Sequence, residues 1–203
     1  MHDGNRSDIL EALAGALQLH LRQMENEQLI EALRNAFGNA AASLREEHNE
    51  NFYYYAFIFD EGLHPYISAW SYEAFERYAA EKELTDEDKI WQKWNYADSP
   101  YAVYGYDEFF SEAGRLLDER AGKLSDDELY DREWLTRMQA MEEALKRLDR
   151  AGFFGFGEIR KNVVINVEQA PPDCREYERA LRLNPQSELL GEYLEICERE
   201  EQT

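Results

Sequence analysis

Apolar residues recur at helical spacing along the first quarter of the chain, in two stripes separated by a mostly polar stretch. Ser7 or Asp8 can cap a first helix over 8–22, and the second stripe predicts a helix over 25–47. We therefore divide the chain into an N-terminal helical extension, residues 1–24, and a single α+β domain, residues 25–203. The two stripes consist of Ile9, Leu10, Leu13, Leu17 and Leu21, then Leu29, Leu33, Phe37 and Leu44.

The helical pattern gives way to the run NFYYYAFIF, which begins at Asn51 and is typical of a β-strand. Successive side chains of a strand point to opposite faces, so residues 52, 54, 56 and 58 would share one face and residues 53, 55, 57 and 59 the other. Neither face is polar. Because so many helices surround so few strands, we expect at least one face to be covered, with Phe57, Ile58 and Phe59 in the core. The pattern leaves open whether the second face is an aromatic surface for a partner.

Turn and cap signals place the remaining elements. A hairpin turn leads to a return strand over 64–70, and a β-branched run over 163–167 predicts a third strand. Helices are expected over 107–122, from 125 to about 150, and in the last 30 residues. The sum is an α+β fold, with a small, mainly antiparallel sheet of three to four strands packed by several helices. The signals are the turn Asp60-Glu61-Gly62, the capping residues Ser71, Thr85, Ser125 and Asp173, and the helix stop Gly152.

The charge balance narrows the classes of partner. The 203 residues include 43 acidic and 22 basic ones, which gives a net charge of −21. Such a chain repels phosphate groups, so binding to nucleic acid or to a membrane surface is disfavoured, whereas a basic partner is attracted. The alternative is that the excess of acidic residues serves only solubility.

Cysteine usage and hydropathy point to the cytoplasm. Cys174 and Cys197 stand alone near the C-terminus, without the tighter spacing of a disulfide framework, so we expect two thiols in a reducing compartment. No apolar run is long enough to span a bilayer. We expect a cytoplasmic monomer or weak homodimer, in which the first helix is a possible dimerisation element.

No catalytic or metal-binding motif emerges from the sequence. The four histidines lack metal-ligand spacing, Gly-x-Ser-x-Gly is absent, and the acidic pairs fit helix ends and solvated faces. His64 is the one histidine in a plausible site position, although a solvated hairpin histidine is the simpler interpretation. The link Gly152–Gly157 follows a helix and enters a strand, opposite to a phosphate loop, so its glycines fit a helix stop and close packing of phenylalanines. We expect no cofactor and no metal.

Aromatic residues crowd the irregular segment between 91 and 106. We expect Trp91 and Trp94 in the core, whereas Tyr101 and Tyr104 fit the edge of the core and a contact surface equally well. A nucleic-acid stacking platform would need more basic residues than the local Lys89 and Lys93.

The order of several motifs resembles a bacterial family, domain-of-unknown-function family 4303. The motifs are REEHNENFYYYAFIFDEG, PYISAWSYEAFER, WNYADSPY, GFFGFGEIRKNVVINVE and RALRLNP. The resemblance covers about Glu25 to Pro185 and leaves the first 24 residues outside. It implies a small cytoplasmic bacterial protein of the kind proposed as immunity partners of secreted toxins. It transfers no functional residue.

Our leading hypothesis is an immunity-type binding protein that neutralises a basic toxin or effector domain by direct contact. Carboxylates would stand where a nuclease holds phosphates, and aromatic residues would anchor the contact. The expected contact residues are Asp98, Tyr101, Tyr104, Asp107 and Glu108, with Asp60, Glu61 and His64 as a second patch.

Two other classes of function stay open. A small hydrolase would use carboxylates and His64 in a concave pocket. A regulatory module would bind its partner through the N-terminal amphipathic helix, Asp8 to Arg22.

Overall fold

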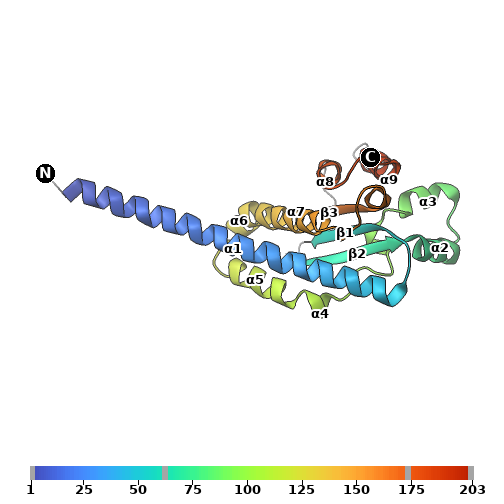
Figure 1. The fold of residues 1–203 in the computed structure, drawn as a ribbon, viewed down its shortest axis with the longest axis horizontal. Coiled ribbons are helices and arrows are strands. Elements are labelled where there is room, and N and C mark those ends of the chain that lie inside the picture. The colour runs from blue at the N-terminus through green and yellow to red at the C-terminus, as the bar shows by residue number, and fades with distance from the viewer. Residues whose placement is uncertain (1–2, 61–63, 172–174, 201–203) are drawn as a thin grey trace.

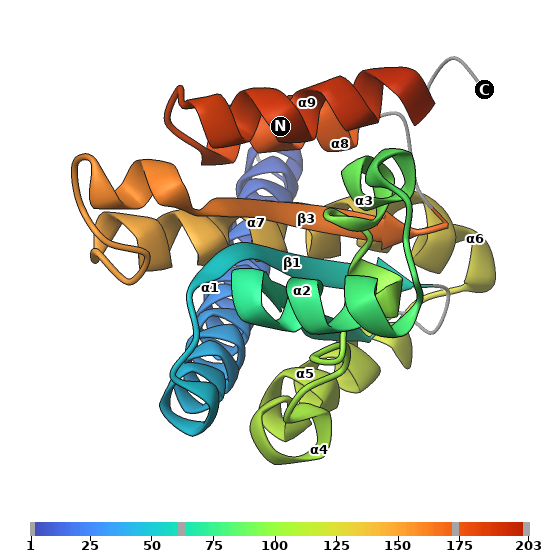
Figure 2. The ribbon, with the colours of Figure 1, turned by 90° about the vertical axis from the view of Figure 1, so that its right-hand side faces the viewer.

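A three-stranded sheet of order β2-β1-β3 forms the centre of the protein in the computed structural model, which describes residues 3–60, 64–171 and 175–200 (Figure 1). Helices lie on both faces of the sheet, with α1 and α7 on one side and α2 and α3 on the other (Figure 2). The elements are α1 Asp3–His48, β1 Phe52–Asp60, β2 Pro65–Ser71, α2 Tyr72–Glu81, α3 Asp86–Gln92, the 3-10 helix η1 Tyr96–Asp98, α4 Tyr106–Phe109, α5 Ser111–Ala121, α6 Asp126–Glu128, the π-helical turn η2 Leu129–Glu133, α7 Trp134–Arg150, the 3-10 helix η3 Ile159–Asn162, β3 Val164–Ala170, α8 Glu176–Leu183 and α9 Glu188–Glu200.

The α+β class is confirmed, but the sheet is mixed rather than mainly antiparallel. β1 pairs with β2 in an antiparallel hairpin and with β3 in parallel, so that Tyr54 lies opposite Val164 and Phe57 opposite Val167. The helices between β2 and β3 return the chain to the starting end of β1, and β3 therefore runs in the same direction. The first five residues of β3 are all buried, which is typical of a strand in parallel pairing that is covered on both faces.

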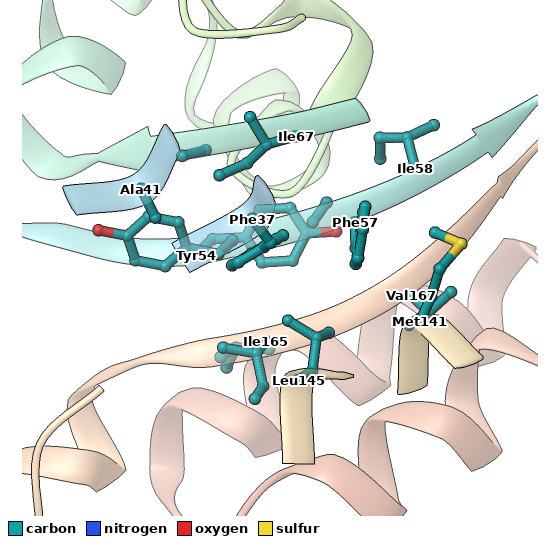
Figure 3. Packing of buried hydrophobic residues seen from close by; sticks show 14 of the residues in the cluster. Phe37, Ala41, Tyr54, Phe57, Ile58, Ile67, Met141, Leu145, Ile165 and Val167 are labelled. Atoms are coloured by element: carbon teal, nitrogen blue, oxygen red, sulfur yellow. The ribbon is translucent and has the colours of Figure 1, made fainter. Parts of the chain in front are cut away.

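Both faces of β1 are buried, which answers the question raised by its aromatic composition. Phe57, Ile58 and Phe59 are fully buried, as predicted. Phe57 packs against Phe37 of α1, with ring centroids 4.9 Å apart (Figure 3). Tyr54 packs instead against Trp94 and Tyr193, with ring centroids 5.5 and 5.7 Å away. Neither face of this strand is available as an aromatic surface for a partner.

The predicted alternation fails at the first two residues of β1. A register shift between Phe52 and Tyr54 interrupts the pairing with β2. Phe52 consequently stacks on Tyr55, and Tyr53 packs against Trp94 on the same side as Tyr54. An extra residue of this kind is a β-bulge, which locally reverses the direction of side chains.

The two predicted N-terminal helices are one continuous helix, because no residue between 22 and 25 breaks the helical hydrogen bonds of α1. Its first half projects away from the rest of the protein (Figure 1). The core begins at Leu29, whereas the large apolar residues described between 13 and 24 are exposed. No helix in the described part of the chain combines the length and apolarity needed to cross a membrane. The exposed apolar side chains are Leu13, Leu17, Leu19, Leu21 and Met24.

The capping signals are confirmed where the structure describes them. The Ser71 hydroxyl accepts a hydrogen bond from the Ala74 amide, and Thr85 forms a capping box with Asp88. The predicted helix over 107–122 is divided at Phe110 into α4 and α5, and the long helix after Ser125 is interrupted by η2. The hairpin residues Glu61 and Gly62, and Asp173 and Cys174, lie outside the described residues.

Two expectations about buried aromatic residues are only partly correct. Trp94 lies in the core, but Trp91 is 36% exposed, since α3 contributes no buried residue. In the glycine-rich link Phe154 is buried and Phe153 lies 4.4 Å from the Arg45 guanidinium, whereas Phe156 is exposed.

Candidate partner-binding surface

The loop between η1 and α4 is held in one conformation against the sheet. The Val103 amide donates a hydrogen bond to the Ile67 carbonyl of β2 over 2.9 Å. Val103 has a φ of +61° and Gly105 a φ of +63°. A β-branched residue rarely adopts this left-handed conformation, which costs about 1–3 kcal/mol. The strained loop nevertheless presents the Val103 side chain to solvent, 48% exposed.

Tyr104 stands next to Val103 at the C-terminal end of α1. Its hydroxyl group lies 3.2 Å from the Ser43 hydroxyl. Burial, assisted by the neighbouring Glu47 carboxylate, raises the pKa of Tyr104, while the hydrogen bond from Tyr104 lowers the pKa of Glu47. The phenol therefore stays protonated beside an ionised carboxylate.

Two predicted acidic contacts begin the next helix. Asp107 and Glu108 occupy the first turn of α4, and both are exposed. Glu108 is close enough to Tyr104 to raise its pKa. Among the residues that the structure describes, neither Asp107 nor Glu108 is within ion-pair distance of a basic side chain. Their negative charge is therefore left to solvent or to a partner.

The second predicted patch lies alongside the same helix. One ring nitrogen of His64, Nδ1, lies 3.1 Å from the Tyr106 hydroxyl, and the other, Nε2, lies 2.8 Å from Asp118. Burial and then the nearby Asp60 carboxylate raise the pKa of Tyr106. Tyr106 thus joins Asp60 and His64 to the surface around α4, and the two patches become one. Both nitrogens of His64 are engaged within the protein, which leaves it poorly placed as a general base.

Two predicted contacts, Tyr101 and Asp98, have other surroundings. Tyr101 is only 5% exposed, and its hydroxyl donates to Glu50 over 2.7 Å and accepts from Arg77 over 3.2 Å. Burial and Glu50 raise the pKa of Tyr101 to about 12. Asp98 is exposed and accepts a hydrogen bond from the Asn95 side chain. Tyr101 therefore offers a partner very little surface.

Glu50 stands at the centre of the hydrogen bonds around Tyr101, and its role was not predicted from the sequence. Its carboxylate accepts hydrogen bonds from Ser71, Tyr101 and Arg77. Burial alone would raise the pKa of Glu50, but these three donors outweigh it and the pKa is lowered. The available signal was the position of Glu50 two residues before a buried strand, because an acidic side chain so close to the core needs hydrogen-bond donors.

The residues around α4 form one surface, which we call the α4 surface. Val103 and Tyr104 lie at its centre. The residues around them are Glu47, Asp60, His64, Asp107, Glu108 and Asp118. Of the predicted contacts, Glu61 lies outside the described residues. Val103 was not predicted as a contact, and neither were Glu47, Tyr106 and Asp118, since only the fold brings α1, α4 and α5 together here.

Comparison with known proteins gives one match. The family model described as "Domain of unknown function (DUF4303)" matches residues 29–185. No curated protein and no solved structure matches the chain. The match begins near the first core residue of α1, Leu29, and ends just after α8, so it spans the sheet and most of its covering helices. The chain therefore belongs to the DUF4303 family.

Proposed function

We propose that this protein is an immunity-type binding protein that neutralises a basic bacterial toxin or effector domain in the cytoplasm, by direct contact through the α4 surface and without turnover. The observation that supports this most is the strained, exposed Val103 beside Tyr104, close to the exposed Asp107 and Glu108, which form no ion pair with the residues that the structure describes. Backbone strain lowers the stability of the fold, so a strained residue on an exposed loop supports a role in binding rather than in folding.

The chemistry of the surface fits a basic protein partner. An apolar and aromatic centre with a charged rim is the usual anatomy of a protein–protein interface. The net charge of −21 would speed encounter with a partner of opposite charge. The α4 carboxylates would meet the arginine and lysine residues with which such a partner holds phosphate groups.

Capture from the source cell tests the proposal. Immobilised protein should retain one basic protein at low salt and release part of it at high salt, because exposed charges are screened. Val103→Arg should lower the retained amount at least tenfold. The matched control is Leu135→Arg on α7, since Leu135 is equally exposed at 48%.

Two results would contradict the proposal. Equal retention by the wild type and Val103→Arg would place the contact elsewhere. Retention of the partner that does not change with salt would remove the electrostatic part of the argument.

A further inference from the structure

A second feature of the fold is a partly open cavity of about 380 Å³ lined by α3, η1, β3, the start of α8, and α9. Figure 2 shows α3 lying between the end of β3 and α9. The walls of the cavity carry the aromatic residues Trp91, Trp94 and Tyr96. They also carry two carboxylates, Glu168 and Glu176. No lysine, arginine or histidine is among the described residues that line it. The volume lies near the lower end of the range for small-molecule sites, roughly 300–1,000 Å³.

Glu168 is the unusual residue of this cavity, because it is an acidic side chain only 2% exposed. The hydroxyls of Tyr54 and Tyr193 each donate to its Oε1 over 2.5 Å, and the Asn166 amide donates to the same atom over 3.2 Å. The other oxygen, Oε2, accepts no hydrogen bond from the described residues. Burial, reinforced by the Glu168 carboxylate, raises the pKa of both tyrosines well above their ordinary value, so both remain donors.

Two other buried carboxylates of the protein, Glu133 and Glu142, have basic partners. Glu133 binds Arg120 over 2.7 Å, and Glu142 binds Arg182 over 2.9 Å. Glu168 forms no ion pair of this kind with any residue in the described ranges 3–60, 64–171 and 175–200. Burial of a carboxylate without a counter-charge is costly. A cation that enters the cavity would supply the missing charge.

The aromatic walls attract cations, since the Arg199 guanidinium already lies 5.9 Å from the Trp91 ring and the Lys93 ammonium 5.2 Å from the Trp94 ring. Trp94 meets Tyr54 and Tyr193 edge to face, with ring centroids 5.5 and 5.2 Å away. Trp91, 36% exposed, belongs to both the cavity wall and the surface. The negative faces of such rings attract ammonium and guanidinium groups. An anion would be repelled by Glu168, and a neutral ligand would leave its charge uncompensated.

We propose that this cavity is a binding site for an organic cation, a guanidinium or alkylammonium group that pairs with Glu168 and lies against Trp91 and Trp94. The site does not rest on the partner-binding proposal, because its residues are separate from the α4 surface. The cation has two possible sources, a free small molecule or an arginine or lysine side chain of a polypeptide. Both sources share the same chemistry.

Tryptophan fluorescence of the whole protein provides the test. Titration with arginine amide should give a saturable change, and its neutral isostere, citrulline amide, should bind at least tenfold more weakly. Glu168→Gln should weaken arginine amide about 10- to 100-fold, as expected for loss of a charged hydrogen-bond partner. The matched control is Glu195→Gln, an exposed glutamate on α9 that does not line the cavity.

A second variant keeps the test valid if Glu168→Gln does not fold. Trp91→Leu alters a partly exposed residue outside the core and should weaken arginine amide about 3- to 30-fold. Any of three results would overturn the proposal. Arginine amide and citrulline amide could bind equally well, neither arginine amide nor spermidine could show saturable binding, or Trp91→Leu could leave the affinity unchanged. Binding of a blocked Gly-Arg-Gly peptide as tight as that of arginine amide would support a polypeptide source. Binding of the free cations alone would support a small molecule.

Discussion

Removal of the Tyr101 hydroxyl by Tyr101→Phe should destabilise the fold without changing its surface. The hydroxyl joins Glu50 and Arg77, with distances of 2.7 and 3.2 Å, in a site where the ring is 5% exposed. Loss of a hydrogen bond to a charged group costs about 1.5–3 kcal/mol. We expect about 1.5 kcal/mol, because Glu50 keeps its hydrogen bonds from Ser71 and Arg77.

Tyr101→Ala should have a larger effect, about 3–5 kcal/mol, because it also leaves a cavity. The ring packs against His48 and Phe52, with centroids 4.6 and 5.6 Å away. Loss of partner binding in this variant would therefore report unfolding as readily as a lost contact. Tyr101→Phe separates the two effects.

Urea unfolding followed by circular dichroism measures the change. The midpoint for Tyr101→Phe should fall while the slope stays constant, which indicates lower stability and an unchanged exposed area. Affinity for a captured partner should be retained. An unchanged midpoint together with lost affinity would refute the reasoning and make the hydroxyl a contact group.

Three further outcomes follow from the same structure. Val103→Gly should raise the free energy of unfolding in urea by about 1 kcal/mol, because relief of the left-handed backbone strain exceeds the entropic cost of glycine. A lower free energy of unfolding would show that the valine is not strained. The folded-state pKa of Glu50 lies below its ordinary value of 4.5, so its carboxylate stabilises the fold above about pH 4.5 and this contribution disappears as the pH falls through the lowered pKa. Glu50→Gln should accordingly lose less stability than the wild type between pH 5 and pH 3, and parallel profiles would contradict the assignment. Deletion of residues 1–23 should shift the melting temperature by less than about 2 °C, because the part of α1 that enters the core begins at Leu29. A larger shift, or a lower molecular mass in light scattering, would show that the projecting helix is packed against another copy.

Local signals in the sequence predicted the elements better than their arrangement. Ser71 and Thr85 cap helices as expected, because a capping residue acts on amides only two or three positions away. The direction of β3 depends on where the intervening helices lead the chain, which no local pattern records. The bulge near Tyr53 similarly depends on pairing with β2.

The candidate surface was predicted in part for the same reason. Asp107 and Glu108 are exposed, as their place at the start of a helix suggested. Tyr101 and Tyr104 have the same composition signal, yet Tyr101 is buried on Glu50 and Tyr104 is half-buried beside α1. Exposure of a tyrosine is set by the element packed against it, and for both residues that element is distant in the sequence.

The association rate of the captured basic partner tests the central claim most directly. The double variant Asp107→Lys/Glu108→Lys removes most of the negative charge of the α4 surface. The control Glu195→Lys/Glu198→Lys changes the net charge equally on α9, which Figure 2 shows at the opposite end of the molecule from α4. We expect the α4 variant to lower the association rate constant at least tenfold at low salt, and the α9 variant to lower it by less than threefold. Equal effects of the two variants would contradict the account, because the net charge alone would then attract the partner.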